Sequence, residues 1–372
     1  MKRISGTIKR LEKTEYFVPY PLPPKDPAFI MSSEIVDLQS KTILALAKLN
    51  EISHLIPSVQ RFVKSCVMKE AQLSSSIEGI NTTLLDAFTT TLLDIKANKE
   101  TQLVLNYFQA TQVAVEMIQK QNMPLINRVI NTAHATLLQG SDGQKANPGK
   151  YRQQSVRVGN LIPAPAFDIP DCMSDLEKYI NDQEPLGALI QAGLAHVQFE
   201  TIHPFLDGNG RIGRMLIVLM LLDSKLLSVP MLYPSYYFKK YHYEYYDKLD
   251  TVRRDGDFES WILFYLKVIL ESSQDAYQRA LEIHTLHISM NEKIKKSNLS
   301  AKKTEQVSML LDYLFENPVI SISTVATHFS KPYNSIKQLF DIAQSLEIIK
   351  LSTKQTRNKV FVCFDYLNIL DK

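Results

Sequence analysis

The stretch from His203 to Arg214, HPFLDGNGRIGR, contains a histidine, an aspartate, three glycines and two arginines. A histidine can take or give a proton near neutral pH. Glycines on both sides of Asn209 let successive backbone N–H groups point into one concavity, which is a nest for an anion. The helix that we expect from Arg211 adds its N-terminal amides and positive dipole end. The spacing therefore predicts a phosphate site with a proton acceptor beside it.

The charged side chains of this stretch suit the same ligand. Arg211 and Arg214 are three positions apart, which puts them on one helix face. Arginine matches phosphate oxygens and keeps its charge. Asp207 is placed to hold Mg²⁺, which proteins bind through one or two carboxylates plus substrate phosphates. A glycine-rich turn with His203 as an ordinary core histidine is the competing interpretation, and the coincidence of base, carboxylate, glycines and arginines disfavours it.

A second stretch, EAQLSSSIEGI from Glu70 to Ile80, places Ser74 and Glu78 one helical turn apart. Gly79 is a good helix terminator and leaves Glu78 at the end of the helix. The competing interpretation is a surface glutamate beside an ordinary C-cap.

Composition excludes several classes of protein. The 372 residues include 42 Lys and Arg against 39 Asp and Glu, so the charge balance indicates neither a nucleic-acid nor a membrane partner. Cys66, Cys172 and Cys363 lie far apart, which argues against a disulfide framework and fits a reducing cytosol. The longest apolar run, around 215–222, is too short to span a bilayer, and the N-terminus has no signal-peptide core. We expect a cytoplasmic protein.

Apolar spacing predicts a mainly α-helical chain. The expected helices cover residues 32–56, 58–77, 83–96, 100–120, 125–138, 171–181, 186–202, 211–222, 243–254 and 258–272. The exception is 149–165, GKYRQQSVRVGNLIPAP, which alternates apolar and polar residues around Gly159-Asn160 and predicts a β-hairpin. Tyr16 to Pro24 should be extended and polyproline-like.

The last 75 or so residues follow a different pattern. Three helices and two strands around a basic turn resemble a winged helix-turn-helix domain. Lys350, Lys354, Arg357 and Lys359 would line the wing and could contact phosphates. The recognition helix, 333–346, has Lys337 against Asp341 and no arginine to bind guanine. DNA binding is therefore the weaker hypothesis, and protein interaction or dimerisation is the alternative.

The first stretch also carries a family resemblance. HPFLDGNGRIGR matches the signature of the Fic (filamentation induced by cAMP) family, H-x-F-x-D/E-G-N-G-R-x-x-R, at every specified position. The resemblance covers roughly residues 51–272. It implies a helical bundle with a β-hairpin flap, and transfer of AMP from ATP to a Ser, Thr or Tyr hydroxyl of a target protein or of the chain itself.

The resemblance also implies a role for each matching residue. His203 would be the general base, Asp207 would hold Mg²⁺, and Phe205 would wedge the loop into the core. Gly208, Asn209 and Gly210 would cradle phosphates, and Arg211 and Arg214 would grip the distal ones. In the flap, which would align the target peptide by backbone pairing, the nucleotide-contacting stretch falls on Val158, Gly159, Asn160 and Leu161. Tyr245 would flank the nucleotide, although Arg253 departs from the asparagine that several relatives carry.

The second stretch resembles the family's inhibitory helix motif, S/T-x-x-x-E-G/N, in Ser74, Glu78 and Gly79. If Glu78 pairs with Arg214, that arginine is not free to hold the γ-phosphate. The resulting domain prediction is an N-terminal helical region at 1–100 with its inhibitory helix at about 58–79, a Fic catalytic domain at 101–285 and a winged helix domain at 295–372.

The predicted function is an autoinhibited protein adenylyltransferase that uses ATP and Mg²⁺. Two alternatives stay open: removal of AMP from a modified protein at the same site, and a DNA-binding transcriptional regulator whose Fic-like domain senses nucleotide. We expect no membrane partner, and a homodimer is compatible with the sequence.

Overall fold

Helices α7 (Ala188–Ile202) and α8 (Asn209–Asp223) form the centre of the fold, and the His203–Arg214 stretch covers the loop between them and the first turns of α8. Almost every side chain of both helices is buried, because both are apolar around most of their circumference. Such helices must be covered on all sides. The structure, a computed structural model, describes residues 3–55, 59–140, 146–159, 161–182, 185–352 and 359–372.

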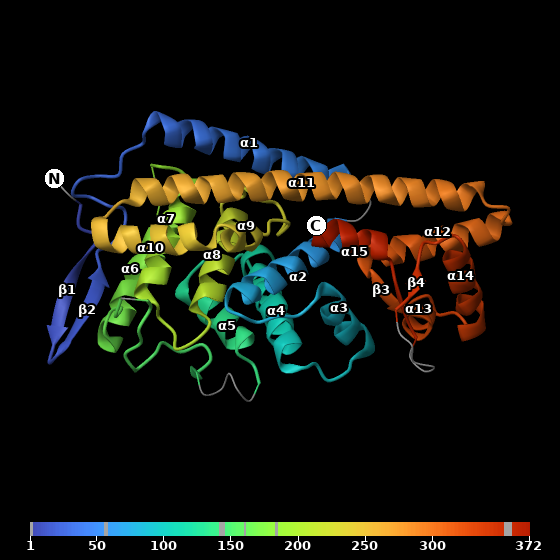
Figure 1. The fold of residues 1–372 in the computed structure, drawn as a ribbon, viewed down its shortest axis with the longest axis horizontal. Helices are drawn as coiled ribbons and strands as arrows, with labels where there is room; N and C mark the ends of the chain where they lie inside the picture. The colour runs from blue at the N-terminus through green and yellow to red at the C-terminus, as the bar shows by residue number, and fades with distance from the viewer. Residues whose placement is uncertain (1–2, 56–58, 141–145, 160, 183–184, 353–358) are drawn as a thin grey trace.

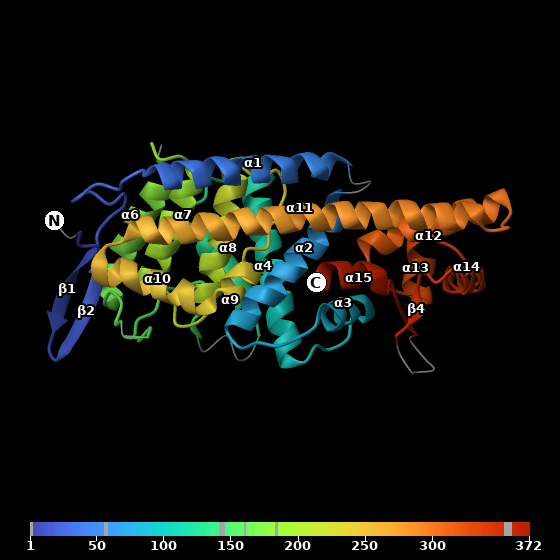
Figure 2. The same cartoon turned by 45° about the horizontal axis from the view of Figure 1, so that its top comes forward.

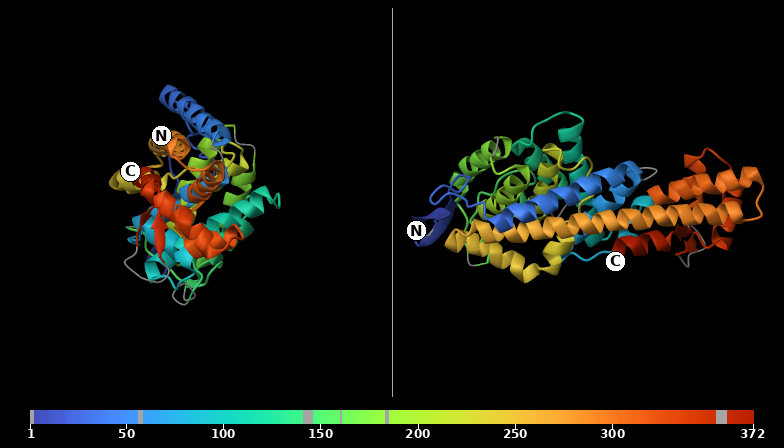
Figure 3. Two further views of the ribbon diagram at one scale, coloured as in Figure 1. Left: turned by 90° about the vertical axis from the view of Figure 1, so that its right-hand side faces the viewer. Right: turned by 90° about the horizontal axis from the view of Figure 1, so that it is seen from above.

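Helices from both halves of the chain surround this central pair. They are α1 (Ser33–Leu55), α2 (Val59–Ile77), α3 (Leu84–Leu93), α4 (Lys99–Gln119), α5 (Asn127–Leu137), α6 (Ile169–Asn181), α9 (Ser235–Lys240), α10 (His242–Asp255) and α11 (Phe258–Lys296). Figure 1 shows α11 running along the molecule, with α1 beside it over the helical bundle and the C-terminal elements at the other end. The view from above in Figure 3 shows the same arrangement. The prediction of a mainly helical chain is confirmed.

Helix α11 is longer than predicted. It begins after Asp257, whose side chain accepts a hydrogen bond from the Ser260 amide, and it continues to Lys296 instead of ending near residue 272. The later turns bury Ala276, Ala280 and Ile283 on one face and carry polar residues on the other. The charged residues at 291–296 suggested the start of a different segment. They belong to α11, which keeps one buried face up to this point.

The N-terminus forms a β-hairpin that the sequence analysis missed. Strands β1 (Gly6–Leu11) and β2 (Thr14–Pro19) pair antiparallel, with Gly6 opposite Pro19. The expected polyproline-like segment is therefore partly strand β2. The Phe17 amide also donates to the carbonyl of Ile162 at 2.8 Å, so the hairpin braces the segment predicted as the flap.

The predicted flap hairpin is reduced to one bridge, in which Val158 and Leu161 exchange two backbone hydrogen bonds of 2.8 and 2.9 Å. Asn160 lies outside the described residues. No strand of several residues occurs in the described part of 149–165, so the predicted short β-hairpin is confirmed only as this antiparallel bridge. Pro163 and Pro165 lack the N–H that a ladder requires.

The C-terminal elements match the predicted pattern of three helices and a small sheet. They are α12 (Ala301–Glu316), β3 (Val319–Ser321), α13 (Ile322–His328), α14 (Tyr333–Ser345), β4 (Lys350–Leu351), β5 (Val360–Val362) and α15 (Phe364–Asp371). The strands pair in the order β3-β5-β4. The assignment of this module as a winged helix domain stays a prediction. Of the basic residues expected along the wing, Lys354 and Arg357 lie outside the described residues. Helix α15 was not predicted.

The three cysteines are free, as expected, and Cys66 and Cys363 are buried. In the described part of the chain, none of the helices is both long and apolar enough to cross a bilayer.

Candidate active site

The loop between α7 and α8 is closed by its own side chains. His203 ends α7 in the left-handed region (φ 50°), and Gly208 precedes α8 with φ 81°. The Asn209 side chain accepts from the Phe205 amide at 2.9 Å and donates to the Phe205 carbonyl at 2.8 Å. Asn209 therefore shapes the loop with its side chain, which leaves only its backbone to face a ligand.

His134 supports the same loop from α5. Its ring stacks on that of Phe205 with centroids 3.7 Å apart, which agrees with the role of Phe205 as a wedge. The ring accepts from the Gly149 amide at Nδ1 (2.9 Å), so Nε2 carries the proton that bonds to the Asp207 carbonyl (2.9 Å). Burial lowers the pKa of His134 to about 4. A neutral His134 thus fixes the backbone before Gly208.

Arg152 holds the backbone of His203, a role that the sequence analysis did not assign. Its side chain is fully buried. Nε donates to the His203 carbonyl at 2.8 Å, Nη2 donates to the Ala164 carbonyl at 2.6 Å, and Nη1 donates to the Gln154 carbonyl at 3.1 Å. One guanidinium thereby joins the flap segment to the residue in the left-handed conformation. The only local sign was an arginine within the segment predicted as a hairpin.

The His203 imidazole is neutral at physiological pH. Burial, and then the positive charges of Arg253 and Arg152, lower its pKa to about 4. Its Nδ1 atom is buried and has no hydrogen-bond partner among the described residues. A neutral imidazole has one unprotonated nitrogen, which can accept a proton.

Arg211 offers unused donors at the start of α8. Its Nε and Nη1 atoms are buried and have no partner within the described ranges, whereas Nη2 bonds to both Asp207 oxygens at 3.3 Å. Buried donors without partners are costly and mark a place for a missing acceptor. Together with the first amides of α8, they fit an anion.

Asp207 meets the requirements of a magnesium ligand. Its side chain is 61% exposed, although it also accepts from the Gly208 amide at 2.6 Å. In the described part of the chain there is no cluster of three or more His, Cys, Asp or Glu residues that could hold a metal. One accessible carboxylate is what Mg²⁺ uses when substrate phosphates supply further ligands.

Glu78 and Arg214 form the ion pair that the family resemblance implied. Arg214 Nη2 lies 2.8 Å from Glu78 Oε1, and Ser74 accepts from Arg214 through its hydroxyl and its carbonyl, both at 2.9 Å. A Cβ atom at Gly210 would collide with the Glu78 carboxylate. This carboxylate therefore lies against the first turn of α8, where an anion would bind.

The electrostatics of this pair involve further buried groups. Burial alone would lower the pKa of Arg214, but the charge of Glu78, followed by Tyr245 and Glu200, raises it well above its usual value. Glu200 is buried and its Oε1 atom has no partner among the described residues. Burial raises the pKa of Glu200 to about 7. Sequence analysis missed Glu200, although it stands three positions before His203.

Glu70 anchors the helix that carries Glu78. Its carboxyl accepts from the amide and hydroxyl of Ser235 at 3.1 and 2.5 Å, and burial raises its pKa to about 7. Glu70, Ser74 and Glu78 are spaced by four residues. Glu70 and Ser74 therefore lie on one face of α2, and Glu78 is the first residue after that helix. That spacing was the available signal for Glu70.

Tyr245 was expected to flank the nucleotide. It is buried, and its hydroxyl bonds to His196 Nε2 at 2.9 Å. Tyr245 also contributes to raising the pKa of Arg214. Arg253, which replaces the expected asparagine, donates to the Thr201 hydroxyl at 3.1 Å and to the Glu200 carbonyl at 2.9 Å. Arg253 thus stabilises the last turn of α7.

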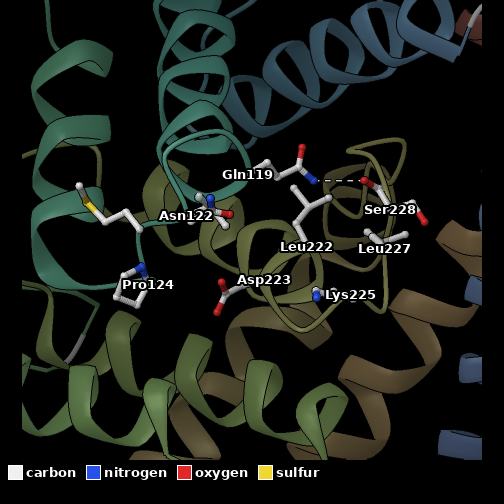
Figure 4. A pocket seen from close by; sticks show the side chains of 10 residues that line it. Gln119, Asn122, Pro124, Leu222, Asp223, Lys225, Leu227 and Ser228 are labelled. Atoms are coloured by element: carbon white, nitrogen blue, oxygen red, sulfur yellow. Dashed lines mark hydrogen bonds between the residues drawn. The ribbon is translucent and has the colours of Figure 1, made fainter.

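A hollow of about 650 Å³ lies at the opposite end of α8, where Leu222, Asp223 and Lys225 line it together with Asn122 (Figure 4). None of the predicted site residues lines it. The candidate active site is thus at the N-terminal end of α8.

Comparison with known proteins agrees with this position. Residues 124–221 match the Fic/DOC family, and residues 37–116 match the Fic/DOC family N-terminal model. The chain is 33% identical over 119 residues to "Protein adenylyltransferase Fic" of Culex quinquefasciatus, covering 31% of this chain and 22% of that protein. It is 25% identical over 237 residues to the protein of the same name in Nematostella vectensis, covering 61% and 52%.

Solved structures share the fold. A Fic family protein from Desulfovibrio desulfuricans G20 aligns with a TM-score of 0.59 and 20% identity, covering 90% of this chain and 97% of that one. Fic-1 from C. elegans aligns with a TM-score of 0.52 and 18% identity, covering 68% and 74%. The chain spans about a fifth of the first curated relative. Residues 124–221 are thus similar to the Fic/DOC family, and the helical fold of the chain is similar to that of a solved Fic family protein.

Proposed function

We propose that the chain transfers AMP from ATP to a hydroxyl side chain of a protein, and that Glu78 holds it in an autoinhibited state. The observation that carries the proposal is the Glu78 carboxylate on Arg214 at 2.8 Å, against the first turn of α8. A nucleotide phosphate and this carboxylate would compete for the same arginine. The relatives named as adenylyltransferases support ATP as the substrate.

In the proposed reaction, His203 takes the proton from the acceptor hydroxyl. The hydroxyl oxygen forms a bond to the α-phosphorus of ATP, the bond from that phosphorus to the α,β-bridging oxygen breaks, and pyrophosphate leaves. The unpaired donors of Arg211 and the amides of α8 would hold phosphate oxygens. Asp207 would hold Mg²⁺, which neutralises charge on the phosphates when bound.

The test is incorporation of α-labelled ATP by three forms of the protein. We expect weak labelling of wild type, strong labelling of Glu78→Gly, and none of the Glu78→Gly/His203→Ala double variant. Equal labelling of all three would show that His203 and Glu78 have no part in the transfer.

A further inference from the structure

Helix α2 is held at both ends by different parts of the molecule. Near its C-terminal end, Ser74 and Glu78 contact Arg214. Nearer its start, Ser65 and Lys69 contact the C-terminal helix α15. Figures 1 and 2 show α15 next to α2, on the side toward the C-terminal elements.

The contact between α2 and α15 is buried and polar. The Tyr366 hydroxyl donates to the Ser65 hydroxyl at 2.9 Å, and both side chains are fully buried. Lys69 is also buried, and its ammonium donates to the Leu370 carbonyl. Carbonyls in the last turn of a helix lack intrahelical donors and attract cations. Lys69 therefore caps α15, and an apolar residue in its place would leave that carbonyl without a donor.

Other contacts fix the same junction. Arg279 of α11 donates to the Ile369 carbonyl at 2.9 Å and is itself paired with Asp275. Lys64, one residue before Ser65, donates to Asn317 at the end of α12 at 2.9 Å. The C-terminal module thus packs on α2 as well as on α11 and α3.

We infer that α15 is a latch that keeps α2 in its inhibitory position, so that displacing α15 releases Glu78 from Arg214. Displacement removes two buried hydrogen bonds from α2, and a continuous helix carries the resulting movement to its last turn. The polar contacts of α2 that remain include Glu70 on Ser235, Lys64 on Asn317 and the Arg214 contacts themselves. This inference rests on the proposed function, because α15 would regulate the same site. It also gives the C-terminal module a role within this chain.

The test compares two pairs of matched variants. Leu370→Ala truncates a buried leucine of α15, and Leu339→Ala truncates a buried leucine of α14 in the same module. Tyr366→Phe removes only the hydroxyl that bonds to Ser65, and Tyr313→Phe removes the hydroxyl of a half-buried tyrosine of α12. The first readout is hydrogen exchange of the amides of residues 70–79, and the second is AMP labelling.

We expect amide exchange at 70–79 to rise by about fivefold in Tyr366→Phe and by at least about tenfold in Leu370→Ala. The two control variants should leave it near the wild-type rate. Labelling should rise in the same order, and Leu370→Ala should add nothing to Glu78→Gly. Equal exchange in Leu370→Ala and Leu339→Ala would overturn the latch. Because exchange requires no activity, a protein that fails to transfer AMP but shows the exchange response would refute the proposed function alone.

Discussion

Glu78 and Arg214 are 136 positions apart in the chain, and their charged groups lie 2.8 Å from each other. The arginine is buried, whereas the side chain of the glutamate is 37% exposed. Arg214 therefore cannot leave the site, and Glu78 is the partner that can move. A phosphate group that binds Arg214 has to displace a carboxylate that is already there.

The first prediction concerns nucleotide affinity without any acceptor. Glu78→Gln keeps the shape of the side chain but removes the charge, so ATP should bind about tenfold more tightly, as measured by titration calorimetry. Glu116→Gln, which alters an exposed glutamate paired with Lys120, is the control. Unchanged affinity in Glu78→Gln would mean that the carboxylate and the nucleotide do not compete.

The second prediction separates Ser74 from its neighbours. Ser74→Ala removes the hydroxyl that accepts from Arg214 Nε at 2.9 Å, which costs the inhibited state about 1 kcal/mol. AMP transfer should therefore rise by about fivefold, less than in Glu78→Gly. Ser76→Ala should have no effect, since the Ser76 hydroxyl bonds to the Leu73 carbonyl within α2. Equal activation by both variants would point to loosening of the whole helix.

The third prediction concerns Arg152. In the Glu78→Gly background, Arg152→Met should lower kcat by about a hundredfold, because the backbone of His203 and the flap segment lose their shared donor. KM for ATP should change little, since Arg152 makes no contact with Arg211 or Arg214. Arg152→Lys keeps the charge and one donor group and should recover part of kcat. A parallel loss of kcat and ATP affinity would show a general structural role instead.

The fourth prediction follows from the buried Glu200 carboxyl. Burial raises its pKa to about 7, so the folded protein keeps a proton there that the unfolded chain releases above about pH 4.5. Its contribution to stability is complete below pH 4.5 and is lost as the pH rises through 7, a difference of about 3 kcal/mol. Glu200→Gln cannot ionise. Urea unfolding should show the variant to be more stable than wild type at pH 8 and equal to it at pH 4.5.

A stability gain of the same size at both pH values would contradict this account, because it would not depend on ionisation. Glu292→Gln, at an exposed position on α11 that pairs with Lys296, serves as the control and should follow wild type.

The parts of the site whose residues are neighbours in the chain could be predicted from the sequence. Helix periodicity placed Ser74 and Glu78 on one face, and the glycines marked the start of α8. The pairing of Glu78 with Arg214 was predicted only through a family resemblance, since no local rule joins positions 136 residues apart.

What the sequence did not reveal depends on long-range contacts. The acceptors of the Arg152 side chain come from three separate segments, and the sequence around Arg152 predicted a hairpin instead. Helix α15 is short, and its burial depends on α2 and α11, which are distant in the chain. Strand β2 was taken for polyproline structure because the segment 16–24 is rich in proline, and its pairing with β1 was not predicted.

The most direct test of the central claim uses ATP labelled at either the α- or the γ-phosphate, with wild type and Glu78→Gly side by side. The account predicts that protein acquires the α label and never the γ label, and that the α label rises strongly when Glu78 is replaced. Incorporation of the γ label, or equal α labelling of the two proteins, would contradict it.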